Sequence, residues 1–515
     1  MLQTTDFSRS GWLTGIVPGL LVIALAGCGD GDAGPDPEGA TPDAISPPVF
    51  SAVGGDAFGA PGAQPNAWAD FDRDGDLDLF VGFRGGPDRL YRNDSGTLVD
   101  VAGEFGLAEP SETRAAAWGD YDGDGDFDLY VGFPSSDDMP DRLYENRGDG
   151  EPFVDVAASV GIDVRGTTRQ PVWIDFDGDD DLDLFVALRD GPNRMYRNDG
   201  ATFTEVGAEL GIDDPRRTVG VAWFDMDQDG DFDLFVANQN GDDDTFFRND
   251  DGLFVDVAPR LGMNQPGRPE ELGSVGAAVG DYDNDGDLDL FVASYGPDVL
   301  WENQGDGTFQ NAAAGEPFAE DHHSVSAAFA DYDNDGWLDL YVTVFVSGEP
   351  EAEDLLARGG PGGFTAVTPA AMKARGASHG VAWADFDQDG DVDLALANNA
   401  PEVGTHPLYR NELSAQDANR SLQVIILDLA AQWSRVGSEL RVYDADGGAL
   451  LATRIVDVGG GYSSQGAAPI HVGLPVGVER VDVLATVIAG GVRHERWVRD
   501  VDPATYRGTT LMIGG

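Results

Sequence analysis

Residues 70–83 read DFDRDGDLDLFVGF, and the sequence is organised around copies of this stretch. Its first nine residues recur, with small changes, at Asp120, Asp175, Asp225, Asp281, Asp331 and Asp385. The starts lie 50, 55, 50, 56, 50 and 54 residues apart. We call these segments blocks 1 to 7 and number the residues of each block 1 to 9. A repeat of this length indicates that one supersecondary unit is built seven times.

Each block lies between segments that are typical of β-strands. A small-residue apolar segment precedes the block, as in NAWA at 66–69, and LFVGF at 79–83 follows it. A third strand continues the pattern, as in RLYRND at 89–94, and a fourth is expected at 153–157, 203–207 and 254–258. Four short strands per repeat indicate a propeller blade. A linear solenoid is the less consistent alternative, because it would need atypical capping repeats.

The two ends of the repeat region indicate a closed ring. After block 7 a third strand is expected at 408–412, but no fourth strand follows it. Residues 49–53 (VFSAV), before block 1, read as the missing strand. We therefore predict an all-β fold: a seven-bladed β-propeller over 49–412, closed by its N-terminal strand, with a small β domain at 413–515. We expect it to be a monomer.

The blocks have the chemistry of a site for a hard cation. Positions 1, 3, 5 and 9 are Asp in every block, and position 6 is Gly in six of them. Alternate carboxylates on a tight loop converge oxygen atoms on one point, which suits Ca²⁺ better than Mg²⁺. An EF-hand is excluded because position 12 is an apolar strand residue rather than Glu. No Cys/His cluster supports a softer metal.

We predict about seven Ca²⁺ ions, one per blade, each bound by the side chains of positions 1, 3, 5 and 9 and the carbonyl of position 7. The predicted ligands are Asp70, Asp72, Asp74, Asp76 and Asp78; Asp120, Asp122, Asp124, Asp126 and Asp128; Asp175, Asp177, Asp179, Asp181 and Asp183; Asp225, Asp227, Asp229, Asp231 and Asp233; Asp281, Asp283, Asp285, Asp287 and Asp289; Asp331, Asp333, Asp335, Trp337 and Asp339; and Asp385, Asp387, Asp389, Asp391 and Asp393. Asp180 replaces the position-6 Gly of block 3, so we expect a weaker or distorted site there. We expect the ions to staple the inner strands of each blade rather than to take part in ligand binding.

The blocks resemble the FG-GAP/VCBS repeats of bacterial surface proteins and of integrin α-subunit propellers, over about residues 49–412. That resemblance implies calcium binding by the Asp loops. Residues 413–515 are similar to the ASPIC/UnbV domain of cartilage acidic protein-like proteins, on the segments 436–442, 459–465 and 471–474. The Trp-Pro-x-Gly segment usual in that family is replaced by ATVIAGG at 485–491.

Charge excludes one class of partner. The chain has 93 Asp+Glu against 31 Lys+Arg, a net charge of −62. Nucleic acid is therefore not an expected partner. The excess lies before residue 413, because 413–515 contain nine Arg and eleven acidic residues.

The N-terminal sequence predicts export and anchoring. Residues 12–26 form an apolar stretch that is too short and too broken by Pro and Gly for a good spanning helix. It ends in LAGC at 25–28, which resembles a bacterial lipobox and implies cleavage before Cys28 and lipidation of that cysteine. We predict a signal peptide at 1–27, an acidic tether at 28–48 and a protein anchored by lipid at the bacterial outer membrane, on its periplasmic or surface face.

Function is predicted from the propeller mouth, where such folds usually bind ligands. Gln64, Arg114, Arg169 and His379 occupy matching positions six residues before their blocks and are candidate ligand-binding residues. Hydroxyl residues recur one position earlier, and we expect these to make strand-end hydrogen bonds. We predict a non-enzymatic binding, adhesion or scaffolding protein with a protein or glycan ligand. A lyase-like enzyme acting on polysaccharide is the alternative.

Overall fold

The computed structural model describes residues 48–515 except 109, 135–138, 313–316, 347–351, 374–376, 401–404, 428–434, 446 and 515. Residues Pro47–Gly515 form one compact unit. The predicted signal peptide, Cys28 and nearly all of the predicted tether lie outside the described residues. Within the described residues, no helix is long and apolar enough to cross a membrane.

The described residues form seven antiparallel sheets that each contain one block, between the first and second strands of the sheet. In chain order the strands are β2 Ala63–Ala69, β3 Asp78–Pro87, β4 Arg89–Asp94 and β5 Thr97–Asp100; β7 Ala115–Gly119, β8 Asp128–Gly132, β9 Arg142–Glu145 and β10 Val154–Asp155; β11 Thr168–Ile174, β12 Asp183–Leu188, β13 Arg194–Asn198 and β14 Phe203–Glu205; β15 Thr218–Phe224, β16 Asp233–Asn238, β17 Thr245–Asp250 and β18 Leu253–Asp256; β19 Gly273–Gly280, β20 Asp289–Tyr295, β21 Val299–Asn303 and β22 Phe309–Asn311; β23 Ser324–Ala330, β24 Asp339–Val344, β25 Leu355–Arg358 and β26 Thr365–Ala366; β27 Ser378–Ala384, β28 Asp393–Asn398, β29 Leu408–Asn411 and β1 Phe50–Ala52. A short strand, β6 Pro110–Glu112, pairs with β3.

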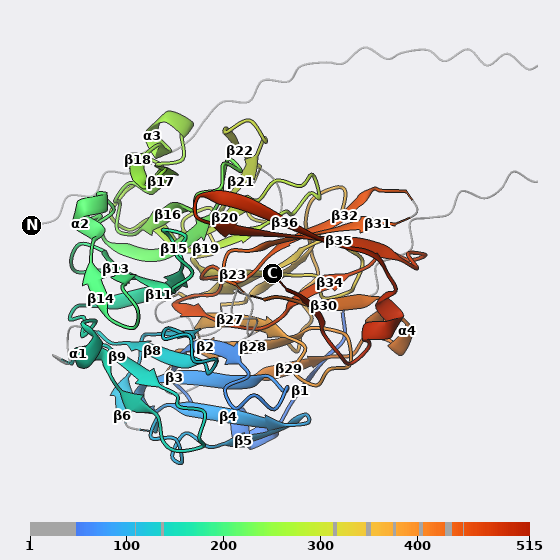
Figure 1. The fold of residues 1–515 in the computed structure, drawn as a ribbon, viewed down its shortest axis with the longest axis horizontal. Helices are drawn as coiled ribbons and strands as arrows, with labels where there is room; N and C mark the ends of the chain where they lie inside the picture. The colour runs from blue at the N-terminus through green and yellow to red at the C-terminus, as the bar shows by residue number, and fades with distance from the viewer. Residues whose placement is uncertain are drawn as a thin grey trace, which may run out of the picture. The chain divides into compact units, whose positions relative to one another are not determined.

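The sheets surround a common axis (Figure 1). The first strands contact one another in the closed order β2, β7, β11, β15, β19, β23, β27 and back to β2. That cycle is the inner wall of a β-propeller, and the predicted fold class is confirmed.

Strand β1 joins the two ends of the repeat region as predicted. It pairs antiparallel with β29, with Phe50 opposite Asn411. The pairing is extended by the Val53 N–H, which donates to the Leu408 carbonyl at 2.8 Å. The sheet that carries block 7 therefore gains its outer strand from the other end of the chain, which covers an otherwise open edge.

The predicted fourth strands are shorter than expected. Residues 153–157, 203–207 and 254–258 were expected as strands, whereas the chain turns into short helices at α1 Ala157–Val160, α2 Gly207–Leu210 and α3 Ala258–Leu261. Each helix ends at a glycine with φ between 75° and 95°, a conformation in which other residues are strained: Gly161, Gly211 and Gly262.

Tryptophans near the ends of the inner strands join neighbouring sheets. Trp68, Trp118, Trp173 and Trp223 are at most 1 % exposed. The indole of Trp118 donates to the Ala67 carbonyl at 3.3 Å, across the boundary between two sheets. These side chains therefore fill the core between sheets and also fix their spacing.

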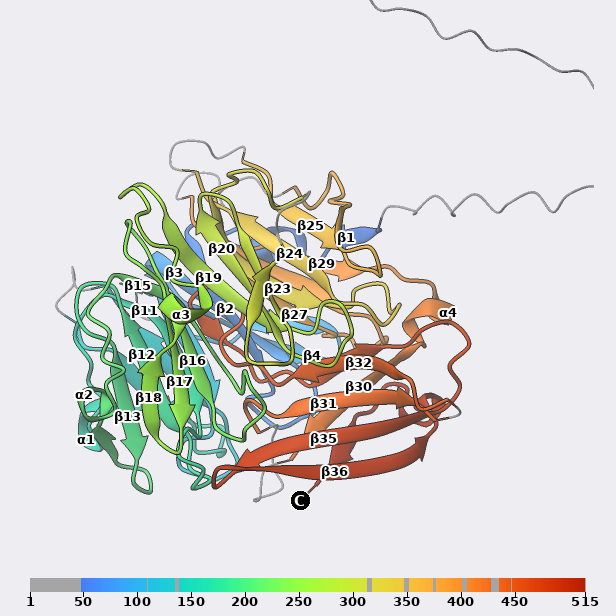
Figure 2. The same ribbon diagram turned by 90° about the horizontal axis from the view of Figure 1, so that it is seen from above.

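The residues after 412 form two further sheets, coloured orange to red in Figures 1 and 2. One sheet has the order β34-β30-β37 and the other the order β32-β31-β35-β36. The elements are α4 Ala415–Ala418, β30 Ser421–Ile426, β31 Glu439–Asp444, β32 Leu450–Ile455, β33 Ser464–Gln465, β34 Ile470–Gly473, β35 Val481–Ala489, β36 Val492–Val501, a 3₁₀ turn η3 at Pro503–Tyr506, and β37 Leu511–Ile513; a second 3₁₀ turn, η1, lies at Gly55–Phe58. Both sheets share a core that includes Leu422, Val442 and Val483.

The recurring hydroxyl residues make strand-end hydrogen bonds, as predicted. Thr113 donates to the buried Asp88 carboxylate of the preceding sheet at 2.7 Å, and Ser324 donates to Asp298 at 2.9 Å. Burial raises the pKa of Asp298 to about 8. In the third sheet Asn193 takes the place of the acid, and its amide donates to the Thr218 hydroxyl at 2.9 Å.

This arrangement predicts a pH dependence of stability. A carboxyl whose pKa is higher in the folded state stabilises the fold at low pH, and that contribution is lost as pH rises from about 4 to about 8. We expect Asp298→Asn to remove this slope, so that the variant is more stable relative to wild type at pH 8 than at pH 5. Thermal melts at both pH values, with Ca²⁺ present, check this. Asp94→Asn is the exposed control, and equal pH slopes for Asp298→Asn and wild type would contradict the prediction.

Candidate metal sites and the propeller mouth

Each block curls into a loop held by its own backbone. In block 1 the Asp70 carboxylate accepts the N–H groups of Asp74 at 3.1 Å and Gly75 at 3.0 Å. Positions 4 and 6 both have left-handed backbone, with φ of 59° at Arg73 and 95° at Gly75. The same pattern recurs in the other blocks, and position 6 is the point at which Gly avoids strain.

The loops bring carboxylate oxygens together. One oxygen from each of three acids lies within 4.8 Å of the others in several blocks. Among these sets are Asp70, Asp72 and Asp78; Asp120, Asp122 and Asp128; Asp175, Asp177 and Asp183; Asp225, Asp227 and Asp229; and Asp281, Asp283 and Asp285. Like charges this close repel unless a cation joins them. These five sets combine predicted positions 1 and 3 with either position 5 or position 9.

Position 9 has a second role within the blade. Asp78 is fully buried and accepts the Phe71 N–H at 3.0 Å and the Asn93 N–H at 2.8 Å. It therefore ties the block to the third strand. Burial raises the pKa of Asp78 to about 8 in the metal-free protein. A bound cation would oppose that shift by favouring the ionised form.

The side chains fit a calcium ion by the chemistry of their donors. All the converging atoms are hard carboxylate oxygens, which is the ligand set that Ca²⁺ prefers. At position 3, buried Oδ1 atoms of Asp227, Asp333 and Asp387 have no hydrogen-bond partner. Such unpartnered buried oxygens are costly in a folded protein, and a cation would satisfy them.

Position 7 does more than the sequence suggested. We predicted only a carbonyl ligand there, but the Asp76 carboxylate accepts the Ser95 N–H at 2.8 Å. Asp231 accepts the Asp251 N–H at 2.8 Å in the same way. These carboxylates therefore hold the turn between the third and fourth strands.

A row of asparagines that sequence reasoning missed links five of the loops to the next sheet. Asn93 donates through Nδ2 to the Phe386 carbonyl in block 7 at 2.7 Å. Asn146 reaches the Phe71 carbonyl in block 1 at 2.8 Å. Equivalent contacts across sheets are made by Asn198, Asn303 and Asn411. The recurring Asn at the end of the third strand was the signal in the sequence.

Arginines from the residues after 412 contact the acids of several blocks. Three position-1 acids accept hydrogen bonds from these arginines. Arg435 donates to Asp175 at 2.6 Å and Arg493 donates to Asp225 at 2.6 Å. Arg454 donates to Asp331 at 3.4 Å. Gln423 likewise donates to Asp385 at 2.6 Å. The basic residues of the C-terminal segment therefore offset part of the acidic excess of the repeats.

Block 3 shows why an acid replaces its glycine. Asp180 has a left-handed φ of 75°, so the expected backbone strain is present. Its carboxylate pairs with Arg435, which also contacts Asp175 and is only 7 % exposed in its side chain. The strain at Asp180 is therefore offset by an ion pair with the buried Arg435 side chain.

This pair predicts strong coupling between the two positions. We expect Arg435→Leu to destabilise the protein by about 3 kcal/mol, because it removes the charge partner of the buried Asp175 carboxylate. Asp180→Gly should destabilise wild type slightly yet stabilise the Arg435→Leu variant, since it removes both the unpaired charge and the strain. A double-mutant cycle from denaturant unfolding measures the coupling, and additive effects would contradict it.

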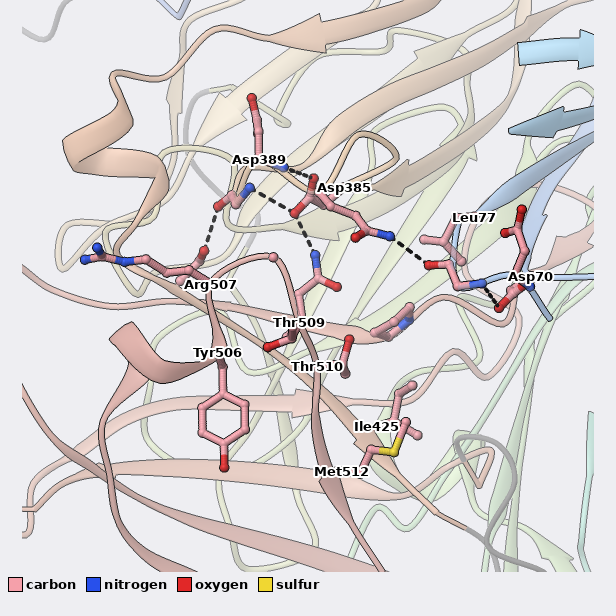
Figure 3. Close-up of a pocket in the computed structure, with 18 of the residues that line it drawn as sticks. Asp70, Leu77, Asp385, Asp389, Ile425, Tyr506, Arg507, Thr509, Thr510 and Met512 are labelled. Carbon is pink, nitrogen blue, oxygen red and sulfur yellow. Dashed lines mark hydrogen bonds between the residues drawn. The ribbon is translucent and has the colours of Figure 1, made fainter. Parts of the chain in front are cut away.

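A cavity of about 590 Å³ lies between blocks 1 and 7 and the C-terminal sheets. Figure 3 shows Asp70 and Asp385 on its propeller side and Ile425, Met512 and Thr510 on the other side. Its lining thus combines block carboxylates with an apolar wall.

A segment of the chain itself lies inside the ring of inner strands. Residues 459–467, which we call the plug segment, lie against the inner strands. Strand β33 pairs in parallel with β7, and the Ala467 N–H donates to the Trp68 carbonyl at 2.8 Å. Gln465 accepts the Trp173 N–H at 2.7 Å and donates to the Trp173 carbonyl at 3.1 Å. Gly461 has a φ of 78°, and a Cβ there would lie 2.4 Å from the Val381 carbonyl oxygen.

The predicted polar residues meet at the mouth of the central channel. Arg169 donates to the hydroxyl of Tyr462, in the plug segment, at 2.9 Å. Arg114 donates to Gln64 at 3.4 Å, and the His379 ring lies 5.3 Å from the Tyr462 ring. Gln64 and His379 are buried, and burial lowers the pKa of His379 to about 3, so that it is neutral. The four residues are therefore close together, and the two arginines are the more accessible.

A family profile described as FG-GAP-like repeat matches residues 70–131, 175–236, 225–292 and 281–342. The chain carries FG-GAP-like repeats. The matches span blocks 1 to 6, so the FG-GAP-like repeats coincide with the block-bearing sheets. No curated protein is significantly similar to the chain.

The chain is also similar to several solved structures at low sequence identity. The chain BBS1N in a complex with ARL6DN has a TM-score of 0.43 at 10 % identity, covering 72 % of this chain and 97 % of that chain. The lectin BP39L from Burkholderia pseudomallei has a TM-score of 0.44 at 12 % identity, covering 69 % and 96 %. The exotype rhamnogalacturonan lyase YesX has a TM-score of 0.41 at 11 % identity, covering 73 % and 74 %.

Proposed function

We propose that this FG-GAP repeat protein is a calcium-stabilised binding or scaffolding protein of the bacterial cell envelope. Its propeller supplies a rigid ring, and the ring presents a ligand-binding mouth. The observation that carries this proposal is the plug segment, which pairs with an inner strand and places Tyr462 among the arginines at one end of the ring.

Calcium has a structural role in this proposal. The block acids sit at the start of β3 and its counterparts and tie the inner strands to the third strands. An ion in each loop would hold those strands together and neutralise the acids. No step of ligand binding passes through the ions.

The finer family assignment belongs to the same proposal. We infer that residues 413–515 form an ASPIC/UnbV-like domain, and its Gly-rich segment at 459–465 is the part that enters the channel. We also propose export and lipidation at Cys28. Globomycin treatment, or Cys28→Ser, should move the protein from the membrane fraction to the soluble fraction, and an unchanged distribution would contradict the anchor.

Retention assays test the binding function itself. The Ca²⁺-loaded protein is applied to glycan and envelope-protein arrays, and the same glycans are screened for cleavage products. Retention on specific ligands without products supports the proposal. Released products would favour the polysaccharide-active enzyme, and an absence of both retention and products would contradict a binding role.

A further inference from the structure

Four arginines gather at the channel mouth of a strongly acidic protein. Arg114 and Arg169 lie at the starts of inner strands, and Arg84 and Arg189 lie at the ends of the second strands beside them. All four are therefore at the end of the ring that faces away from the blocks. The chain as a whole has a net charge of −62, so this cluster of positive charge contrasts with the rest of the protein.

The arginines interact with one another through space. Burial lowers the pKa of Arg114, and the nearby Arg169 and Arg84 lower it further. Burial and Arg169 have the same effect on the pKa of Arg189. Mutual repulsion of this kind persists only where the fold fixes the side chains.

The acids at the mouth compensate only part of this charge. Glu112 accepts from Arg114 at 2.8 Å and from Arg84 at 2.9 Å, so one carboxylate serves two guanidinium groups. Arg169 donates to the Tyr462 hydroxyl, whose pKa the surrounding arginines lower against the effect of burial, and the Arg169 Nε is buried without a partner. In the described part of the chain, Arg169 forms no ion pair.

Aromatic rings border the same place. Tyr295 and Phe345 pack against the cluster that contains Tyr462, and both are partly exposed. The Tyr295 ring stacks on His323 at 5.0 Å, and the Phe345 ring lies 4.9 Å from His379. The mouth therefore places partly exposed aromatic rings beside guanidinium donors.

We propose that this mouth binds an acidic saccharide, with the carboxylate of a uronic acid held by Arg169 and Arg114. Guanidinium groups match carboxylates in geometry as well as charge. The rings of Tyr295 and Phe345 are placed to contact a sugar face. The inference rests on the proposed binding function and names its ligand class.

The test uses the full Ca²⁺-loaded protein and a uronic acid oligomer, measured by calorimetry. We expect binding that weakens as salt is added, because the attraction is electrostatic. Arg169→Gln keeps a hydrogen-bond donor for Tyr462 but removes the charge, and Arg114→Gln does the same beside Gln64. Each should weaken binding at least about ten-fold, as for a charge-assisted hydrogen bond. Arg496→Gln, on exposed β36, is the matched control and should bind like wild type.

Two further probes separate the sources of the effect. A neutral oligosaccharide of equal length should bind at least about ten-fold more weakly, since it lacks the carboxylate. Inorganic phosphate at the same concentration should not match the oligomer, and equal affinity would overturn the saccharide assignment. Unchanged affinity in both folded arginine variants, or no binding of the oligomer, would overturn the site. If the protein is retained on the arrays but the uronic acid oligomer does not compete for that retention, the proposed binding function stands and this inference fails.

Discussion

Removal of calcium is expected to lower the melting temperature by more than about 10 °C, the largest effect in this account. One site occupied at a hundred-fold excess over its Kd stabilises by about 2.7 kcal/mol, so seven sites together contribute on the order of 20 kcal/mol. Without the ion, the acids of each loop repel one another. Thermal melts with and without a chelator measure the shift.

Controls separate the ion from general ionic effects. Restoring Ca²⁺ should restore the melt, whereas the same concentration of Mg²⁺ should restore less, because Mg²⁺ demands tighter geometry and keeps more of its water. Asp70→Asn, in block 1, should reduce the calcium dependence, and exposed Asp94→Asn should not. A melt that is insensitive to chelator would contradict a structural role for the ion.

Loss of the plug contacts is expected to have the second largest effect. Gln465 is fully buried and satisfies both the N–H and the carbonyl of Trp173. Gln465→Leu keeps the size of the side chain but leaves both groups unpaired, at about 1–3 kcal/mol each. We therefore expect destabilisation of about 2–5 kcal/mol in denaturant unfolding.

The matched control for this variant is Gln304→Leu, on an exposed turn after β21. It should change the free energy of unfolding by less than about 0.5 kcal/mol. A Gln465→Leu variant as stable as this control would show that the plug segment does not brace the inner strands.

The repeat architecture could be predicted because short-range sequence patterns specify it. The block spacing, the apolar strands beside each block and the small residues before it specify one blade at a time. The closing strand was also predictable. Residues 49–53 read as a strand outside any repeat, and no fourth strand follows the third strand at 408–412. The ends of the fourth strands were not, because the glycines at 161, 211 and 262 end helices that the alternating pattern conceals.

The site was only partly predictable, because its contacts span long distances in sequence. Arg114 and Arg169 could be placed at the mouth from their positions before the blocks. Tyr462, which they surround, lies almost 300 residues further on from Arg169. Asp180 and Arg435 are also far apart in the sequence. From the sequence alone, Asp in place of Gly in block 3 therefore predicted a weaker site rather than an ion pair.

Metal analysis of protein purified with Ca²⁺ present, after removal of free ion, tests the central claim most directly. We predict about seven calcium ions per chain, one for each acidic loop. Fewer than three ions per chain would contradict a ring of blades held together by calcium.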